Sequence, residues 1–265
     1  MISVLTVNFF SSDQVAGLVA SVRRAAPPQP IELIVTNNSP ADPVPSSADP
    51  ALPIVVLESS NVGYAAGINR AFRASRGTVL MIANPDVRVA AGAITQAVEY
   101  LADHPRTGVV LPLLRYPNGE IQLSVRCFYT WPDVIYARSP LRLLGRHPAF
   151  FRRYLCVDID RGAPTPVDWG LGAAMFLRRS DCGGDAIFDE RFFMYFEDVD
   201  LCYRFWQSGK AVTYCPHIVC THEHRRSSRN PVTLHGWRHL RSLVRFVRKY
   251  GGLPQRPASQ TAWQA

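Results

Sequence analysis

The chain has 265 residues, of which 47% are hydrophobic and 19% charged, a composition typical of a globular protein with a substantial core. We find no apolar run of about 18 residues, so we expect no transmembrane helix. The segment 1–7 lacks the features of a secretory signal. Six cysteines without a CxxC pair are expected to be thiols in a reducing compartment, since neither a disulfide framework nor a zinc site fits their spacing. These features favour a cytoplasmic protein.

The net charge of +8 is concentrated near the C-terminus. Eight Arg or Lys residues and no Asp or Glu lie between Arg225 and Lys249. Such a block suits a partner that bears phosphates, which includes nucleic acid, an anionic membrane face and a diphosphate. The charge by itself does not choose among these three.

Strand-like and helix-like patterns alternate through the first hundred residues. We expect strands over residues 2–7, 31–35, 54–57 and 79–82. We expect three helices. The first is capped by Ser12, the second covers 65–76 and is closed by Gly77, and the third is marked by Ile94, Val98 and Leu101. This alternation predicts an α/β fold with a mostly parallel sheet flanked by helices, in which ligands bind at the carboxyl ends of the strands.

The second half of the chain is less regular. We expect irregular, partly mobile loops over 116–166. The later expected elements are a strand (173–177), an aromatic segment (188–196), a helix (198–207) ended by Gly209, an amphipathic helix (234–249) and a disordered tail after Gly251. We expect one domain over residues 1–230. The basic amphipathic helix and tail, 231–265, are expected to pack on that domain or extend from it.

The sequence Asn84-Pro85-Asp86 follows directly on the apolar strand 79–82. A carboxylate at a strand end, stiffened by the preceding proline, is well placed to bind a hard divalent cation that completes its shell with phosphate and water. A simple Asx-Pro turn explains the same residues.

The segment from Asn61 to Asn69 carries Gly63, Tyr64 and Gly67 at the start of a helix. Small residues there let a diphosphate approach backbone N–H groups. Tight packing of the helix against the sheet is the equal alternative, because glycine spacing alone is weak evidence.

Three carboxylates, Glu197, Asp198 and Asp200, follow the aromatic segment. Helix capping explains one of them. Crowding and desolvation of the others raise a carboxylate pKa towards the range of a general base, so we predict a catalytic role. His222 stands near the basic block and is able to ligate a metal or donate to a phosphate, although alone it is unremarkable.

In this order, these segments resemble the family 2 glycosyltransferases, in particular the bacterial rhamnosyltransferase-like branch. The resemblance covers roughly residues 2–250. The matching pieces are Val7-Asn8, Asn37-Asn38-Ser39, 61–69, Asn84-Pro85-Asp86, Trp169-Gly170-Leu171-Gly172-Ala173, 188–193, Glu197-Asp198-Val199-Asp200, and His222 followed by Ser227.

The resemblance implies a GT-A fold and an inverting, metal-dependent transfer from a nucleotide-diphosphate sugar. It assigns Mg²⁺ or Mn²⁺ to Asp86, at the last aspartate of the family's DxD motif, and to His222. It assigns the general base to Asp198, with Glu197 and Asp200 as further catalytic candidates. The implied donor-binding residues are Asn8, Thr36, Asn38, Asn61, Gly63, Tyr64, Asn69 and Asn84. The implied acceptor-binding residues are Trp169, Gly170 and Gly172.

Two positions depart from the family pattern. Thr36 stands where an aspartate usually contacts the nucleotide base, which puts the base preference in doubt. Asn84 replaces the first acid of a strict DxD, a form that this branch commonly shows.

The favoured function is transfer of L-rhamnose from dTDP-L-rhamnose to a glycan or polyprenyl-diphosphate-linked acceptor in bacterial surface polysaccharide synthesis, such as O-antigen. The C-terminal helix then either contacts the anionic inner face of the membrane or packs on the domain with a solvated basic side. A sugar nucleotidyltransferase would carry a Gly-rich basic loop after the first strand, which residues 8–12 lack. A non-catalytic sugar- or nucleic-acid-binding protein remains the third alternative, which a steep salt dependence of nucleic-acid binding would support.

Overall fold

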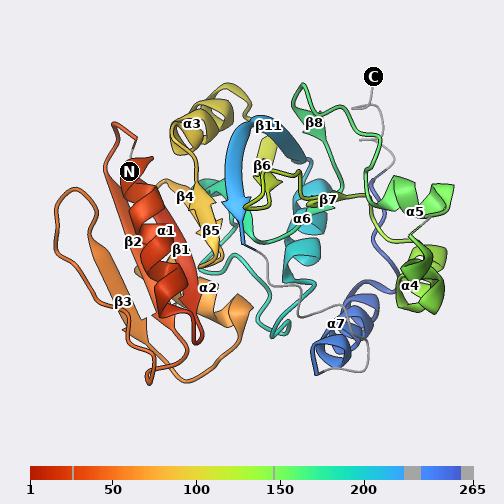
Figure 1. Cartoon of the computed structure of the whole chain (residues 1–265), viewed down its shortest axis with the longest axis horizontal. Helices are drawn as coiled ribbons and strands as arrows, with labels where there is room; N and C mark the ends of the chain where they lie inside the picture. The colour runs from red at the N-terminus through yellow and green to blue at the C-terminus, as the bar shows by residue number, and fades with distance from the viewer. Residues whose placement is uncertain (26, 146, 224–233, 258–265) are drawn as a thin grey trace.

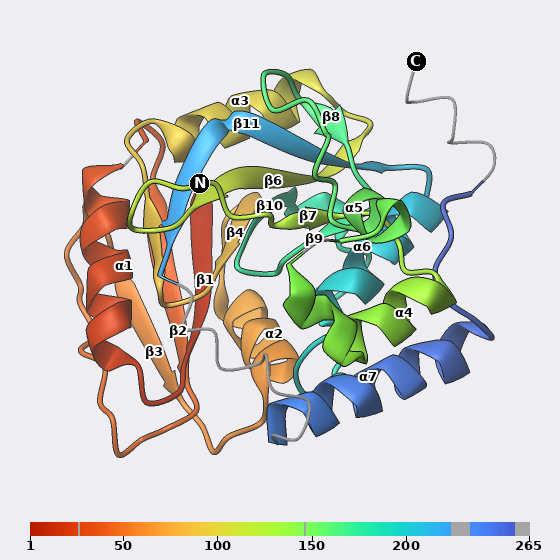
Figure 2. The ribbon, with the colours of Figure 1, turned by 45° about the vertical axis from the view of Figure 1, so that its right-hand side comes forward.

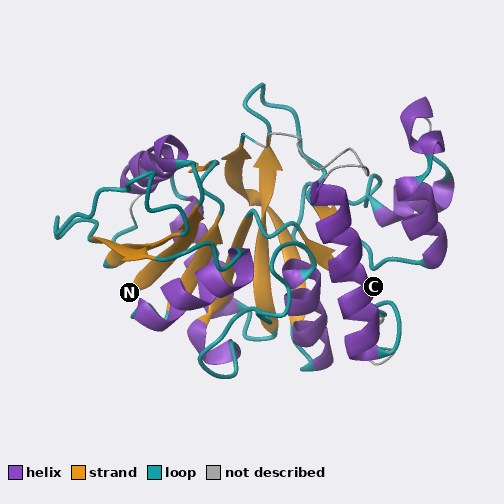
Figure 3. Ribbon diagram, turned by 90° about the horizontal axis from the view of Figure 1, so that it is seen from below, coloured by secondary structure: helices purple, strands orange, loops and turns teal. Residues whose placement is uncertain are grey.

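The computed structural model describes residues 1–25, 27–145, 147–223 and 234–257. A central sheet runs through the molecule, and helices gather around its strands (Figures 1 and 3). The strands are β1 (Ile2–Asn8), β2 (Ile31–Asn37), β3 (Ile54–Glu58), β4 (Val79–Ala83), β5 (Val87–Val89), β6 (Thr107–Arg115), β7 (Val125–Arg126), β8 (Thr165–Pro166), β9 (Trp169–Gly170), β10 (Ala174–Arg178) and β11 (Ala211–His222). The helices are α1 (Ser12–Arg24), α2 (Tyr64–Ala74), α3 (Ala93–Asp103), α4 (Trp131–Arg138), η1 (Pro140–Leu144), α5 (Ala149–Tyr154), η2 (Arg179–Asp181), α6 (Glu197–Gln207) and α7 (Leu234–Tyr250).

The strand order is β3-β2-β1-β4-β10-β6-β11-β5, and β8 pairs with β11. Strands β1 to β4 pair in parallel, as do β6 and β11, whereas β10 runs antiparallel between β4 and β6. Strands β7 and β9 form a small separate sheet. The expected central sheet flanked by helices is therefore confirmed, with antiparallel strands inserted in its C-terminal half.

Successive side chains on each strand point to opposite faces, so the sheet separates two hydrophobic cores. On β4, Leu80 and Ile82 join the core with α2 and α6, while Met81 and Ala83 join the core with α1 and α3. Because all four side chains are buried, helices must cover both faces.

Several expected boundaries are wrong. Helix α1 has Ser11 rather than Ser12 at its N-cap position, and Ser12 donates to Asp42 instead. Helix α2 ends at Ala74, before Gly77, because the Ser75 hydroxyl donates to the Phe72 carbonyl.

The central strands β6 and β11 were not predicted. Each contains a proline, Pro112 or Pro216, which removes a backbone donor and weakens the strand signal. The pairing of β6 with β11 is irregular between Cys215 and Val219, next to Pro216. The segment 116–166 is also more regular than expected, since it contains β7, α4, η1, α5 and β8. All six cysteines are free, and two of them, Cys127 and Cys156, are only half-buried.

Helix α7 lies along one edge of the molecule, beside α4 (Figure 2). Its Leu243 and Phe246 are buried in the core, and the Phe246 ring lies 5.8 Å from those of Phe196 and Tyr203. The helix thus packs directly on the start of α6. The end of the tail, 258–265, and part of the basic block, 224–233, lie outside the described residues.

Candidate active site

The carboxyl ends of β1, β2 and β4 lie together at one edge of the sheet. Asn8 pairs with Asn37 in the register of β1 and β2. Beyond β4, the Asn84 N–H donates to the Ala173 carbonyl at 2.8 Å, just before β10. This bond joins the loop of Asp86 to the turn that carries Gly172, although the two are far apart in the sequence.

Asp198, the second residue of α6, is held against this turn by backbone N–H groups. Its Oδ2 accepts from the Gly172 N–H at 3.0 Å and its Oδ1 from the Val199 N–H at 2.9 Å. A side chain on Gly172 would crowd Asp198, since an added Cβ would lie 3.3 Å from the Asp198 Cβ. Burial raises the pKa of Asp198 from its ordinary value of 3.8 to about 6. The carboxylate is therefore ionised at neutral pH and basic enough to accept a proton.

Glu197 is a buried neighbour of Asp198. Burial, together with the charge of Asp198, raises the pKa of Glu197 well above its ordinary range. Its Oε2 has no hydrogen-bond partner. Tyr195 and Phe196, which precede it, both have positive φ, a strained conformation for side chains of this size. The Ser242 hydroxyl of α7 donates to the Met194 carbonyl at 2.9 Å and helps to hold this turn.

Asp86, in the turn between β4 and β5, meets His222 at the end of β11. Asp86 Oδ1 lies 3.3 Å from His222 Nε2, and β5 pairs with the end of β11 at Val87 and His222. The other ring nitrogen, Nδ1, lies 2.9 Å from Gln122 Oε1, which as an acceptor favours a proton on Nδ1 and a lone pair on Nε2.

A carboxylate and an imidazole lone pair that converge in this way fit a divalent cation. No cluster of three or more His, Cys, Asp or Glu side chains suited to a metal occurs in the described part of the chain. Mg²⁺ and similar cations commonly use only one or two protein ligands and take the rest from phosphate and water. The donor set therefore fits a metal that arrives with a diphosphate.

Tyr64 connects the two halves of the site. Its hydroxyl donates to the Gly172 carbonyl at 3.0 Å. Burial raises the pKa of this phenol well above its ordinary range, and the charges of Glu197, Asp198 and Asp86 raise it further. One phenol thus senses all three carboxylates, which indicates that the proposed base and the metal-binding loop converge.

The loop from Asn61 to Gly63 has the geometry of a tight turn. Asn61 Oδ1 accepts from the Gly63 N–H at 3.1 Å, and the Asn38 amide donates to the Gly63 carbonyl at 3.1 Å. Gly63 has a φ of +89°, and a Cβ there would contact the backbone and ring of Phe193 at 2.6 Å. Both backbone conformation and space therefore require glycine.

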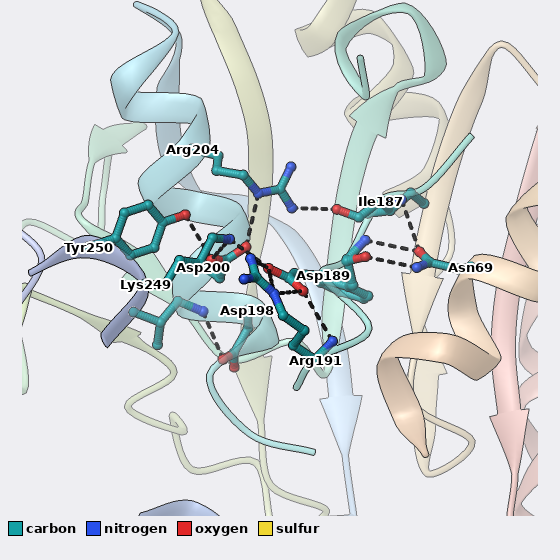
Figure 4. Close-up of polar contacts among 11 residues, drawn as sticks. Asn69, Ile187, Asp189, Arg191, Asp198, Asp200, Arg204, Lys249 and Tyr250 are labelled. Carbon is teal, nitrogen blue, oxygen red and sulfur yellow. Dashed lines mark hydrogen bonds and ion pairs between the residues drawn. The ribbon is translucent and has the colours of Figure 1, made fainter. Parts of the chain in front are cut away.

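Three expected donor-binding residues are turned into the protein. Thr36 is buried and donates to the Gly67 carbonyl of α2 at 2.7 Å. The Asn69 amide group donates to the Phe188 carbonyl at 2.8 Å and accepts from two backbone N–H groups at 187–188 (Figure 4). Asn8 donates to Asn37 Oδ1 at 2.9 Å. These contacts favour structural roles for all three.

The expected acceptor residues divide in the same way. Trp169 is buried, donates from Nε1 to the Cys127 carbonyl at 3.0 Å, and stacks on Tyr129. Gly170 is required by packing, because a Cβ would lie 2.5 Å from the Leu111 side chain. Among the three, Gly172 alone contacts Asp198 through a hydrogen bond.

Asp200 differs from its neighbours in the acidic cluster. It is buried and binds Lys249 and the Tyr250 hydroxyl (2.8 Å) of α7, together with Arg204 Nε (2.9 Å) of its own helix (Figure 4). The oxygens of this carboxylate are thus occupied by donors of the protein itself. The geometry therefore favours a role in attaching α7 over the catalytic role expected from the sequence.

Two residues near the site, Gln122 and Arg126, were not predicted from the sequence. Gln122 orients His222, but a glutamine after a Asn-Gly turn carries no sequence signal for that role. Arg126 on β7 lies within electrostatic range of Asp198, whose pKa it lowers slightly against the effect of burial. The position of Arg126 depends on the pairing of β7 with β9, and no local sequence pattern predicts that pairing.

Solved structures share this fold. The chain superposes on GalNAc-T7 with UDP, GalNAc and Mn²⁺ with a TM-score of 0.64 and 16% identity, covering 94% of this chain and 48% of that one. It superposes on the mannosyltransferase PcManGT from Pyrobaculum calidifontis, in complex with GDP-Man and Mn²⁺, with a TM-score of 0.58 and 17% identity, covering 93% of this chain and 64% of that one. The chain thus spans about half the length of the first structure. The fold is that of a GT-A glycosyltransferase.

The sequence profile of the family "Glycosyl transferase family 2" matches residues 3–151, and the chain belongs to this family. It is 28% identical to the N-acetylglucosaminyl-diphospho-decaprenol L-rhamnosyltransferase of Mycobacterium tuberculosis over 283 residues, covering 98% of this chain and 89% of the relative. It is 35% identical to the rhamnosyltransferase WbbL of Escherichia coli K12 over 83 residues, 31% of each chain. The chain is a glycosyltransferase with rhamnosyltransferase relatives. None of the described helices has the length and apolar character needed to cross a bilayer.

Proposed function

We propose that this enzyme transfers L-rhamnose from dTDP-L-rhamnose, with inversion, to a hydroxyl of a polyprenyl-diphosphate-linked glycan in bacterial surface polysaccharide synthesis. The observation that carries the proposal is the environment of Asp198, a partly buried carboxylate with a raised pKa that is joined through Gly172 to the loop of Asp86. The similarity to a relative named for a decaprenyl-diphosphate-linked acceptor supports the choice of acceptor.

In the proposed reaction, Asp198 removes the proton of the acceptor hydroxyl as its oxygen bonds to the anomeric carbon of the donor. The bond from that carbon to the diphosphate breaks, and the nucleoside diphosphate leaves with the electron pair. Asp86 and His222 would hold Mg²⁺ or Mn²⁺, which supplies charge stabilisation to the departing diphosphate. Because Glu197 is buried, whereas Asp198 is partly exposed and bonded to Gly172, we assign the base role to Asp198 alone.

The proposed donor side is the turn of Asn61, Gly63 and Tyr64, where backbone groups lie close to the start of α2. Thr36 is assigned to the support of α2, so its difference from the family's usual aspartate need not change the nucleotide that is bound. We propose that residues 1–230 form the catalytic domain and that 231–265 are its C-terminal extension.

Two measurements test this function. Purified protein is melted with dTDP, UDP or GDP and their sugars, each with Mn²⁺, Mg²⁺ or EDTA, because a ligand that binds the native state raises Tm. Transfer of rhamnose is then followed by mass spectrometry with a short-chain, water-soluble N-acetylglucosaminyl-diphospho-lipid. Transfer from dTDP-L-rhamnose, lost in Asp198→Asn, is the expected result. Transfer only from a UDP- or GDP-sugar would refute the proposed donor.

A further inference from the structure

Most of the exposed large apolar side chains among the described residues lie on two neighbouring segments. We call these side chains the apolar patch. Ile135 and Trp237 are the most exposed of them, at 68% and 66%. The full patch consists of Trp131, Ile135, Leu141 and Phe150 on α4, η1 and α5, and Trp237, Leu240 and Val244 on α7. Exposed tryptophan and aliphatic side chains in such number usually mark a contact surface.

The two segments lie side by side. Helix α4 runs next to α7 in Figures 1 and 2, and Arg138 approaches His239 Nδ1 at 3.3 Å. The patch therefore occupies one region of the molecule, away from α1 and β3 (Figure 1).

Positive charge predominates in this region, although α4 also contains the buried Asp133, which pairs with Arg153. Residues 134–157 contain five arginines and no acidic residue, and α7 contains four arginines and a lysine and no acidic residue. Some of these cations are paired within the protein, as Lys249 is with Asp200. Arg241 and Arg248 are exposed and have no ion pair in the described part of the chain. The patch is thus a mixed surface of apolar groups and uncompensated arginines.

The apolar and basic groups of α7 line the same hollows. A groove of about 490 Å³ on its outer side is lined by Trp237, Leu240, Arg241, Val244, Arg245 and Arg248. A second hollow of about 240 Å³ lies between α7 and the turn before α6, and Phe193, Met194, Arg238, Arg241, Ser242 and Arg245 line it. Guanidinium groups beside apolar walls suit lipid phosphates with acyl chains next to them.

The patch also adjoins the candidate active site. Helix α7 packs on Phe196, and its Ser242 binds the Met194 carbonyl, only four residues before Asp198. Arg238 lies over the Phe193 ring, which in turn fills the space beside Gly63. A molecule bound at α7 is therefore close to both the base and the proposed donor turn.

We propose that α7 and the segment from α4 to α5 together dock on a bilayer that contains anionic phospholipids. This inference rests on the proposed function, because a lipid-linked acceptor is presented at such a surface. The aromatic and aliphatic side chains enter the interfacial region, and the arginines bind lipid phosphates. Docking there brings Asp198 to the membrane surface, where the acceptor diphosphate lies.

The combination of positive charge and apolar surface favours an anionic bilayer over a second copy of the chain or a nucleic acid. A second copy of the chain in a two-fold contact would place the basic patch against itself, which repels. A nucleic acid would satisfy the arginines but would leave Trp237 and Ile135 in water. An anionic bilayer alone complements both the charge and the apolar surface.

Vesicle sedimentation of the full chain tests the proposal. We expect binding to vesicles of phosphatidylcholine mixed with phosphatidylglycerol, weaker at high salt, and little binding to phosphatidylcholine alone. Arg241→Ala and Arg248→Ala should each weaken binding about fivefold, the effect of one basic residue near an anionic surface. Trp237→Ala and Ile135→Ser should also weaken it. Arg24→Ala on α1 and Val55→Ser on β3 are the matched controls and should bind as the parent does.

Absence of vesicle binding, equal binding to neutral vesicles, or equal losses in the controls would overturn the docking surface. Light scattering that finds a dimer dissociated by Trp237→Ala would assign the patch to a second copy instead. Transfer to the water-soluble acceptor separates this inference from the proposed function. We expect Arg241→Ala and Trp237→Ala to keep that rate and to lose rate only on acceptor embedded in vesicles. Vesicle binding without transfer from any donor would refute the proposed function and leave the docking surface standing.

Discussion

Replacing the candidate base tests the site through stability as well as rate. Burial raises the pKa of Asp198 from 3.8 to about 6, so keeping this carboxylate ionised costs the folded protein about 3 kcal/mol. Below pH 3.8 the group is protonated in both the folded and the unfolded protein, and the cost is absent. As the pH rises, Asp198 ionises at a lower pH in the unfolded chain than in the folded protein. The free energy of unfolding therefore falls between pH 3.8 and the folded pKa of about 6.

Asp198→Asn removes this titration. Made in a Glu197→Gln background, so that the neighbouring carboxyl does not contribute, the asparagine variant should gain about 3 kcal/mol relative to its parent between about pH 4 and pH 7. The amide cannot accept from both the Gly172 and Val199 N–H groups, which adds a cost of about 1 kcal/mol or more at every pH. The change with pH, and not the difference at one pH, therefore reports the pKa.

Urea unfolding of the pair of proteins at several pH values measures this difference. The rate of transfer, in contrast to the stability, should increase with pH. In the wild-type chain, kcat/KM should rise about tenfold per pH unit up to about 6, as the base ionises, and then level off. Asp198→Asn should lower kcat by about 10²- to 10⁴-fold, the usual contribution of a general base. A stability difference that does not change with pH, or an active asparagine variant, would refute the assignment.

Three further substitutions separate ligand binding from support of the fold. Asp86→Ala should abolish the metal-dependent rise in Tm with a nucleoside diphosphate and leave the Tm of the protein alone nearly unchanged, as melting with and without Mn²⁺ would show. Thr36→Val removes the side-chain hydrogen bond to the Gly67 carbonyl and should cost about 1 kcal/mol in urea unfolding, without changing which nucleotide stabilises the protein. Asn69→Ala loses three hydrogen bonds to the backbone at 187–188 and should cost about 3 kcal/mol in the same assay.

Controls and contrary outcomes follow from the same contacts. Asn61→Ala is the match for Asn69→Ala, because Asn61 is exposed and makes one turn contact. Equal losses of stability in the two variants would argue against a structural role for the buried Asn69. If the Thr36→Val variant is as stable as the parent but prefers another nucleotide, Thr36 would instead be a donor-binding residue. Asp86→Ala with an intact Mn²⁺-dependent shift would remove Asp86 from the proposed metal site.

The sequence alone indicated the local elements and the order of the motifs. Strand β1 was found because it is a mostly apolar run, and helix α6 because its pattern is amphipathic; both signals are local to the element. The position of Asp86 after β4 followed from the same pattern, since chain order decides which residue ends a strand. Strands β6 and β11 were not predicted, because each contains a proline and pairs with strands that are distant in the sequence.

Only the tertiary structure decided which of these residues work together. Asp198 and Asp200 are two residues apart in the acidic cluster, and two residues turn a helix by about 200°. Asp198 therefore meets Gly172, whereas the buried Asp200 meets Lys249 of α7. Buried Thr36 likewise binds the backbone of α2, a contact that depends on packing between distant elements. Local patterns report what a residue is able to do, whereas its partners are fixed by long-range packing that no short window of sequence contains.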